Sequence, residues 1–233
     1  MNHMDLPIAT RERIGTIDAV LFDLDGTVVN TIPHILASFR HATQEVLGQA
    51  LPDDVLLEHV GVPLARQMYS FTDDDAVASE LLVVYRAFNH ATHDEMALLY
   101  DDTLVTLEAL ARAEMPMGIV TSKSALMANR ALDLFDIARY FGAVVTADDT
   151  DVHKPDPTPV LEGAARLGVD ATRCVYVGDS LADVAAARGA GALAVAATWG
   201  VASRERLEAA GPDVVLATLF DLVGLLGVGE PVA

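Results

Sequence analysis

Short runs of apolar residues recur along the chain, and most of them end in a polar turn. Unbroken apolar runs of this kind are typical of strands buried on both faces of a parallel sheet. The runs are Ala19–Phe22, Met117–Val120, Ala143–Val145, Cys174–Val177, Leu193–Ala197 and Val214–Leu216. Stretches with apolar residues at helical spacing lie between them, at 103–114, 124–135, about 160–167 and 181–188. This alternation predicts an α/β fold with a doubly wound, Rossmann-like parallel sheet joined by right-handed crossovers.

A long segment with a helical pattern separates the first apolar run from the second. Residues 34–47 carry apolar side chains at helical intervals, and a second such stretch extends from Val77 to Phe88. The acidic run Asp73–Asp75 precedes this second stretch, as is common at the start of a helix. We therefore expect a core formed by residues 1–30 and 100–233, interrupted by an all-helical insert at 31–99.

Composition narrows the class of protein. A chain of 233 residues with 52% hydrophobic residues can bury a substantial core and is not intrinsically disordered. Its net charge of -19 argues against nucleic acid or an anionic membrane surface as a partner. Cys174 is the only cysteine, so no intrachain disulfide can form, which suits a reducing compartment.

The sequence indicates neither a signal peptide for export nor a segment that spans a membrane. Residues 1–15 are too polar for the apolar region of a signal peptide. The longest apolar stretch, 190–202, contains glycines and is too short to span a bilayer. We expect a cytoplasmic protein; the sequence does not indicate its oligomeric state.

The first apolar run is followed directly by Asp23-Leu24-Asp25-Gly26-Thr27. In an open α/β sheet, ligands bind just beyond the carboxyl ends of the strands. Carboxylates at positions i and i+2 of a strand point to the same side, and their repulsion favours a hard cation such as Mg²⁺ between them. An Asx-turn with Gly26 at the bend is the structural alternative. A calcium loop is disfavoured, because the residues that follow are apolar rather than acidic.

Three further strand ends carry polar residues suited to phosphate chemistry. Thr121-Ser122-Lys123 follows one run, Lys154-Pro155 lies in the segment after another, and Asp179 follows Cys174–Val177, with Asp183 further on. Singly, each has a structural explanation: Thr121 as a turn hydroxyl, Lys154 as a loop lysine, and the two aspartates as helix caps. Together they combine carboxylates, a hydroxyl and a fixed cation, which suits phosphoryl transfer.

These four blocks, in this order across residues 19 to about 200, resemble the four motifs of the haloacid dehalogenase superfamily. The resemblance implies that Asp23 is a nucleophile that forms an aspartyl-phosphate, and that Asp25 is the general acid. Thr121 would hydrogen-bond the phosphoryl oxygens and Lys154 would neutralise their charge. The remaining phosphate-binding groups implied by the motifs are Gly26, Thr27, Ser122 and Lys123.

The same resemblance implies a magnesium site. Asp23, Asp179 and the backbone carbonyl of Asp25 would bind Mg²⁺, and Asp183 would support the site through water or by orienting Lys154. Asp25 also distinguishes the phosphatases of the superfamily from its dehalogenases. A dehalogenase needs no acid to protonate a halide, and that branch typically lacks this aspartate. Its presence favours a phosphatase.

The helical insert resembles the cap domain of one branch of the superfamily, which closes over the site and contacts the substrate. On a helix, Arg86, His90 and His93 occupy positions i, i+4 and i+7 and would form one polar face. That face could grip the far end of an anionic substrate; a solvated face, or histidines hydrogen-bonded inside the insert, is the alternative. Arg66 is a further candidate contact.

The string from Tyr85 to Asp94 and the motif Gly61-Val62-Pro63-Leu64 resemble the cap of bacterial pyrophosphatases of the PpaX type. We therefore expect a Mg²⁺-dependent phosphohydrolase, with inorganic pyrophosphate as the favoured substrate and 2-phosphoglycolate or another small monoester as the alternative. A sugar phosphomutase and a non-catalytic phospholigand-binding module remain open as well. Asn30 departs from the family pattern, where many relatives have an acid, but it concerns the hinge of the insert rather than the chemistry.

Overall fold

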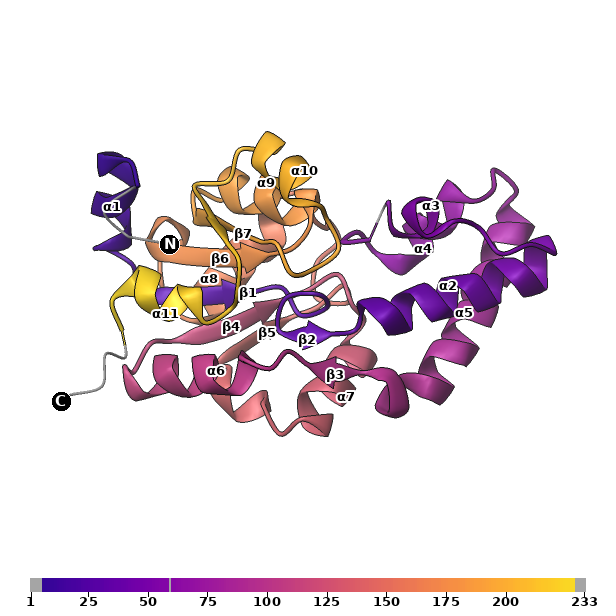
Figure 1. Ribbon diagram of the computed structural model, residues 1–233, viewed down its shortest axis with the longest axis horizontal. Coiled ribbons are helices and arrows are strands. Elements are labelled where there is room, and N and C mark those ends of the chain that lie inside the picture. Colours follow the sequence, from indigo (N-terminus) through magenta and orange to yellow (C-terminus); the bar gives the residue numbers. More distant parts are fainter. Residues whose placement is uncertain (1–5, 59, 229–233) are drawn as a thin grey trace.

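A computed structural model of the chain describes residues 6–58 and 60–228. Residues 1–5 of the polar N-terminal stretch, whose sequence argued against a signal peptide, lie outside this range. The molecule has a layered core at one end and a group of helices at the other (Figure 1). Within the described ranges, no helix combines the length and the apolar character needed to cross a membrane.

The core contains a six-stranded parallel sheet in the order β5-β4-β1-β6-β7-β8. The predicted doubly wound sheet is confirmed. Its strands are β1 (Ala19–Phe22), β4 (Met117–Val120), β5 (Ala143–Val145), β6 (Cys174–Gly178), β7 (Leu193–Ala197) and β8 (Val214–Leu216).

The register of the central strands determines where the polar strand ends meet. Phe22, the last residue of β1, pairs with Ile119 of β4 on one side and with Val177 of β6 on the other. The three strands therefore end nearly level. Side chains that directly follow them share one edge of the sheet.

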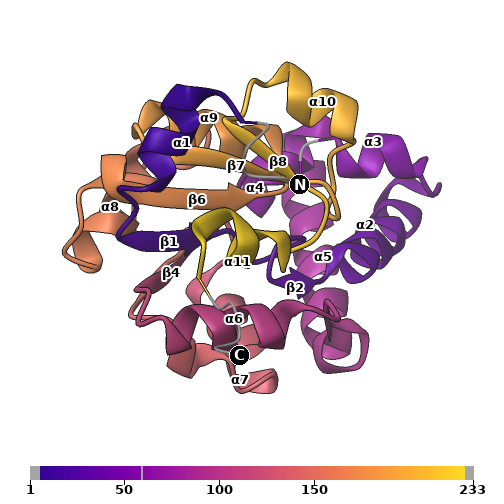
Figure 2. The same ribbon diagram turned by 60° about the vertical axis from the view of Figure 1, so that its left-hand side comes forward.

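Helices cover both faces of the sheet, and each face has its own hydrophobic cluster. In Figures 1 and 2, α9 and α10 lie on one side of the sheet, whereas α6 and α7 lie on the other. Leu107 and Leu110 pack into the first cluster, whereas Val184 and Leu207 pack into the second. The helices of the core are α1 (Ile8–Ile14), α6 (Thr103–Arg112), α7 (Ala125–Leu134), α8 (Thr158–Arg166), α9 (Leu181–Gly189), α10 (Arg204–Ala209) and α11 (Asp221–Leu226), with short 3₁₀ turns at Ala138–Tyr140 and Ala171–Arg173.

The helical insert forms a third hydrophobic cluster of its own. Its long helices α2 (Ile32–Leu47) and α5 (Asp75–Met96) pack along one another at the right of Figure 1. Phe39 and Tyr85 are in ring contact at 4.7 Å between centroids, and Leu81 is fully buried beside them. The shorter elements are α3 (Asp53–Leu57), α4 (Leu64–Gln67) and a 3₁₀ turn at Met68–Ser70. The expected acidic helix start is present, because Asp74 accepts hydrogen bonds from the backbone amides of Ala76 and Val77 at the start of α5.

Two short strands join the insert to the core. β2 (Val29–Asn30) and β3 (Leu98–Leu99) pair in antiparallel fashion, with Asn30 opposite Leu98. The sequence pattern placed the next strand after β1 only near residue 116, so this pair was not anticipated. Two-residue strands are too short to show any period.

Candidate active site

The candidate site lies at the carboxyl ends of the central strands. Asp23 directly follows β1, Thr121 directly follows β4 and Asp179 directly follows β6. Lys154 lies in the loop between β5 and α8. The strand order therefore brings Asp23 close to residues that follow it much later in the sequence.

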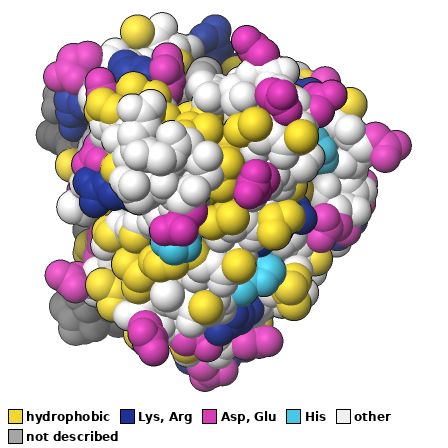
Figure 3. Space-filling model, turned by 90° about the vertical axis from the view of Figure 1, so that its right-hand side faces the viewer, with side chains coloured by type: hydrophobic (Ala, Val, Ile, Leu, Met, Phe, Trp, Pro, Cys, Tyr) yellow, Lys and Arg dark blue, Asp and Glu magenta, His cyan; other side chains and the backbone are white. Residues whose placement is uncertain are grey.

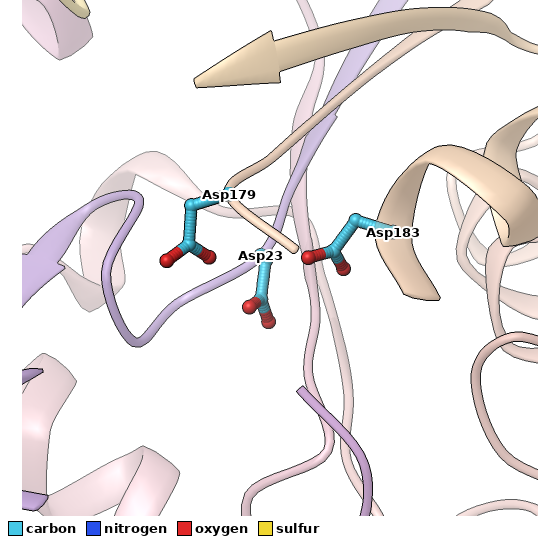
Figure 4. Close-up of side chains that lie close together, drawn as sticks. All are labelled: Asp23, Asp179 and Asp183. Carbon is cyan, nitrogen blue, oxygen red and sulfur yellow. The ribbon is translucent and has the colours of Figure 1, made fainter. Parts of the chain in front are cut away.

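Lys154 lies between two carboxylates (the carboxylates are shown in Figure 4). Its Nζ atom is 2.6 Å from Asp183 Oδ1 and 3.0 Å from Asp23 Oδ1. The Lys154 side chain is only 1% exposed, and those of Asp23 and Asp183 are 6% and 1% exposed. A buried lysine in this position compensates part of the charge that two buried carboxylates carry. The structure thus brings the predicted nucleophile and the predicted cation into contact.

Two residues that sequence reasoning missed help to position this cation. Tyr176, in β6, lies with its hydroxyl 3.0 Å from Lys154 Nζ and donates to Asp183 Oδ1 at 2.9 Å. Ser180 caps α9, and its amide and hydroxyl both donate to Asp183 Oδ2. A tyrosine in a strand that is otherwise apolar was the available signal, because a buried phenol needs a hydrogen-bond partner.

Asp183 therefore has both carboxylate oxygens occupied by protein donors. Oδ1 faces Lys154 and Tyr176, and Oδ2 accepts from Ser180. Of the two supporting roles expected for Asp183, orienting Lys154 agrees better with these contacts than support of the metal through water.

The negative charge of the cluster exceeds the charge of the single lysine. Carboxylate oxygens of Asp23, Asp179 and Asp183 all lie within 4.8 Å of one another, and all three residues are buried (Figure 4). Burial, together with the charge of Asp183, raises the pKa of Asp23 to about 6 against the opposing effect of Lys154. Burial, followed by the charges of Asp183 and Asp23, raises the pKa of Asp179 well above its ordinary value.

This donor set fits a divalent cation. Asp23 Oδ1 makes no hydrogen bond of good geometry within the described residues, and Asp179 Oδ1 receives only a 3.3 Å contact from Thr27. Buried carboxylates that lack full compensation are stabilised by a hard cation with oxygen ligands. Asp23 and Asp179 are the residues whose oxygens remain available to it.

Asp25 lies apart from this cluster and has its own cation. Lys123 Nζ is 2.8 Å from both carboxylate oxygens of Asp25, and the Thr31 hydroxyl donates to Oδ1 at 2.6 Å. Burial raises the pKa of the Asp25 carboxyl, but Lys123 and Thr31 outweigh it and hold the pKa below its ordinary value. Asp23 and Asp25 both line the same cavity, yet they are held by different partners.

The strand end after β4 connects the core to the insert. The Thr121 hydroxyl accepts from the Lys123 amide at 3.2 Å, and Thr121, Ser122 and Lys123 all line the cavity. The Ser122 hydroxyl donates to the carbonyl of Gly61 at 2.8 Å. Ser122 thus binds the loop of the insert that carries the predicted motif 61–64.

The expected phosphate contacts of Gly26 and Thr27 find no support in this geometry. The Gly26 amide donates to the Val29 carbonyl at 2.8 Å, within the turn that follows β1. The Thr27 side chain is fully buried, and its hydroxyl points to Asp179 Oδ1. Neither residue lines the cavity. The tight turn uses these groups to position the carboxylates instead.

A cavity of about 260 Å³ extends from the carboxylates to the insert. Arg86 and His90 of α5, two of the candidate substrate contacts, line this cavity. Arg66 lies outside the lining and is exposed. Acidic side chains are scattered over the surface at the insert end of the molecule (Figure 3), so positive charge near the cavity has to come from individual side chains.

His93 was expected on the same polar face as Arg86 and His90, and this expectation is wrong. His93 is fully buried and continues the buried face of α5 that includes Leu81, Tyr85 and Asn89. Its position, i+8 from Tyr85, brings it back to the helix side that packs on α2. A direct contact with substrate is therefore excluded in this arrangement.

His93 instead belongs to a polar cluster inside the insert. Its ring lies edge-on to His34 at 5.7 Å, and its Nδ1 is 2.8 Å from Asp94 Oδ1. Asp94 accepts from Arg130 of α7 at 2.8 and 2.9 Å, and Arg130 also donates to the His90 carbonyl. These contacts link α5 of the insert to α7 of the core.

Comparison with known proteins adds the context of a family. The family model described as haloacid dehalogenase-like hydrolase matches residues 20–197. Pyrophosphatase PpaX of Bacillus velezensis is 37% identical over 213 residues, which make up 91% of this chain and 97% of that protein. Pyrophosphatase PpaX of Anoxybacillus flavithermus is 34% identical over 212 residues, 91% of this chain and 98% of its own.

Solved structures share the fold. A protein from Haemophilus somnus, described as a predicted phosphoglycolate phosphatase, superposes with a TM-score of 0.83 at 22% identity, covering 90% of this chain and 98% of that one. A haloacid dehalogenase-like hydrolase from Bacteroides fragilis superposes with a TM-score of 0.82 at 25% identity, covering 88% and 99%.

Proposed function

Because the chain belongs to the haloacid dehalogenase-like hydrolase family and is therefore a hydrolase, we propose that it is a Mg²⁺-dependent phosphohydrolase with Asp23 as its nucleophile. The observation that carries this proposal is the contact between Asp23 and Lys154 at 3.0 Å, with Asp23 lining a cavity large enough for a small phosphorylated molecule. We also propose that residues 31–99 act as a cap over this cavity, and that the enzyme works in the cytoplasm.

In the first step, an oxygen of Asp23 forms a bond to phosphorus while the bond from phosphorus to the leaving oxygen breaks. Repulsion between a carboxylate and a phosphoryl group opposes this attack, and Lys154 offsets part of it. Asp23 and Asp179, with the carbonyl of Asp25, would hold Mg²⁺, which supplies further positive charge at the phosphoryl oxygens. Thr121 orients those oxygens through its hydroxyl.

Asp25 acts on the leaving group and then on water. As general acid it gives a proton to the departing oxygen, and as general base it takes a proton from the water that hydrolyses the aspartyl-phosphate. The pair with Lys123 holds Asp25 ionised in the free enzyme. A bound anion that attracts Lys123 would release Asp25 to take up a proton.

Inorganic pyrophosphate is the substrate we favour. The supporting observations are the relatives named pyrophosphatase, at 34–37% identity over nearly the whole chain, and the cations Lys123 and Arg86 that line the cavity. A second phosphoryl group carries negative charge that these side chains can pair with. The alternative, 2-phosphoglycolate, would present a carboxylate to the same cations.

The test is phosphate release at fixed Mg²⁺ from pyrophosphate, 2-phosphoglycolate and several sugar phosphates. Pyrophosphate should be preferred, and Asp23→Asn should abolish release from every substrate. Release that survives in Asp23→Asn contradicts the mechanism. A phosphorylated product without free phosphate would indicate a mutase, and tight binding without turnover a binding module.

Two matched substitutions test the role of the insert. Arg86→Met should raise the KM for pyrophosphate, because Arg86 lines the cavity. Arg66→Met should leave the KM unchanged, because Arg66 is equally on the insert but lies outside the lining. Equal effects of the two variants would contradict this assignment of Arg86.

A further inference from the structure

The loop that follows β7 lies directly against Asp179. The Val201 amide donates to Asp179 Oδ2 at 2.7 Å, and the Ala202 amide donates to the Asp179 carbonyl at 3.2 Å. A Cβ atom built on Gly200 would lie 2.1 Å from Asp179 Oδ2 and 2.2 Å from Asp179 Cβ. The loop can approach this closely only because residue 200 has no side chain.

The turn after β1 lies against the same carboxylate. A Cβ atom on Gly26 would lie 2.2 Å from Asp179 Oδ2, and the Thr27 hydroxyl points to Oδ1 at 3.3 Å. Asp179 is therefore held between two backbone segments that are distant in the sequence. Any change in the spacing between these segments changes the position of its oxygens.

Two aromatic side chains bridge these segments. The Tyr100 hydroxyl lies 3.2 Å from the Gly26 carbonyl and 3.3 Å from the Trp199 carbonyl. The Trp199 indole Nε1 donates to the Thr27 carbonyl at 3.0 Å. Burial, together with the charges of Asp179 and Asp25, raises the pKa of Tyr100, so that its hydroxyl remains a donor.

Tyr100 also lies where the chain re-enters the core from the helical insert. It directly follows β3, the strand by which the chain returns from the helical insert to the core. Through this side chain, the return linker of the insert contacts the nucleophile turn at Gly26 and the loop at Trp199. The linker and the two loops form one connected unit around Asp179.

We propose that Tyr100 and Trp199 are positioning residues that fix the spacing of the Gly26 and Gly200 loops and thereby set the affinity of Asp179 for Mg²⁺. The inference rests on the proposed function, since it takes Mg²⁺ as the ion that Asp179 binds. Mg²⁺ demands near-ideal octahedral geometry, so a small displacement of one carboxylate weakens binding. Because Tyr100 lies on the return linker, Mg²⁺ affinity and the position of the insert are coupled, and the coupling is reciprocal.

The chain offers its own probe for this proposal. Trp199 is the only tryptophan in the sequence, so intrinsic tryptophan emission reports on this loop alone. Mg²⁺ is titrated without substrate into the wild-type protein, Tyr100→Phe and the control Tyr69→Phe, with calorimetry as a second readout. Tyr69 is an exposed residue of the insert whose hydroxyl donates to Asp75 Oδ1 at 3.2 Å, far from the three aspartates.

Tyr100→Phe should raise the Kd for Mg²⁺ by about tenfold, the low end of the range for residues that orient metal ligands. Tyr69→Phe should bind as the wild type does. Trp199→Phe, measured by calorimetry, should weaken binding in the same direction, and Gly200→Ala should abolish it. Saturating Mg²⁺ should restore the turnover of Tyr100→Phe, which a general loss of structure would not allow.

An unchanged Kd in Tyr100→Phe would overturn the proposal. Asp179→Asn separates this failure from failure of the proposed function. If wild type binds Mg²⁺ and Asp179→Asn does not, the metal site is established and only the role of Tyr100 and Trp199 is at stake. If the wild type does not bind Mg²⁺, or Asp179→Asn binds it equally well, both proposals fall.

Discussion

Lys154 and Asp183 form a salt bridge of 2.6 Å in which each side chain is only 1% exposed. The lysine ammonium is also 3.0 Å from Asp23, so it serves two carboxylates at once. Burial works against a charged lysine, but Asp183 and Asp23 more than compensate and raise the pKa of Lys154 above its ordinary value. The charge of Lys154 is therefore a fixed component of the site at any pH at which the protein folds.

Lys154→Met should reduce both stability and activity. Removing one partner of a buried ion pair costs about 3–5 kcal/mol of unfolding free energy, and phosphate release should fall by about 10²–10³ or more. The loss of stability should be larger at pH 8 than at pH 5, because unpaired buried carboxylates are neutral at the lower pH. Urea unfolding at both pH values measures this loss of stability.

The control is Tyr176→Phe, which removes only a hydroxyl near Lys154 and should lower the free energy of unfolding by about 1 kcal/mol. Equal losses of stability in the two variants would contradict this prediction.

Mg²⁺ should stabilise the protein more at pH 8 than at pH 5. Without metal, the pKa of Asp23 is raised from 3.8 to about 6 in the native state. Between about pH 4 and 6, the native state therefore keeps a proton on Asp23 that the unfolded chain has already released. Metal-free stability therefore falls as the pH rises from about 4 to 6, and Mg²⁺ must displace that proton below about 6. Thermal unfolding with Mg²⁺ and with a chelator checks this. An increase in Tm that does not depend on pH would exclude Asp23 as the titrating ligand.

Gly61→Ala should impair substrate turnover with little effect on global stability. Gly61 has φ of +110°, and a Cβ there would lie 2.5 Å from Ser180 Oγ, so the loop of the insert would have to withdraw from the core. The hydrogen bond from Ser122 to the Gly61 carbonyl would lengthen with it. We expect kcat/KM to fall by about tenfold or more, by analogy with misplaced groups near reacting atoms. Gly48→Ala is the matched control, because it has φ of +73° but nothing within 4 Å.

Arg130→Met should loosen the insert without unfolding the core. Arg130 is 35% exposed and Asp94 49% exposed, so the pair should contribute about 1 kcal/mol or less to global stability. Its loss should nevertheless increase hydrogen exchange in the linkers around residues 29–31 and 97–99. High salt should do the same in the wild-type protein. Arg166 is 34% exposed, much as Arg130 is, and pairs with Asp149 and Glu162 within the core, so Arg166→Met should leave exchange in the linkers unchanged.

His34 should make the insert sensitive to acid. Burial, followed by the charges of Lys123 and His93, lowers the pKa of His34 from 6.5 to about 4. The neutral form is favoured in the native state, so this contribution to stability is complete above pH 6.5 and is lost as the pH falls towards 4. In His34→Gln this loss is absent, and the stability difference between variant and wild type should shrink or reverse between pH 7.5 and 4.5. Parallel curves of unfolding free energy against pH would refute this.

The parallel sheet could be predicted closely because its strands are unbroken apolar runs. Five of the six strands have the bounds expected from the sequence, and β6 extends one residue further, to Gly178. Helix α1 was missed because its seven residues make only about two turns and carry apolar side chains only at their two ends, too few to show a period. The pair β2 and β3 was missed because pairing partners that lie nearly seventy residues apart leave no local signal.

The candidate site could be predicted where a reactive side chain directly follows a strand. Asp23, Thr121 and Asp179 come together because the strands before them are neighbours in the sheet. The contacts of Tyr100 and Trp199 could not be predicted, since they depend on the path of loops that have no periodic pattern. His93 was misassigned because spacing along a helix shows which residues share a face, but not which face packs against a neighbour.

The antiparallel pairing of Asn30 with Leu98 means that the chain leaves the core and returns to it at a single point. In the gene, the segment between them is therefore a separate insertion. Its two ends are adjacent in space, and the order of strands in the sheet does not depend on the residues between them. Another helical segment with neighbouring ends can be spliced in at this point without altering the chain path of the core. Under the proposed function, substrate range and phosphoryl chemistry are therefore encoded in separable parts of the gene.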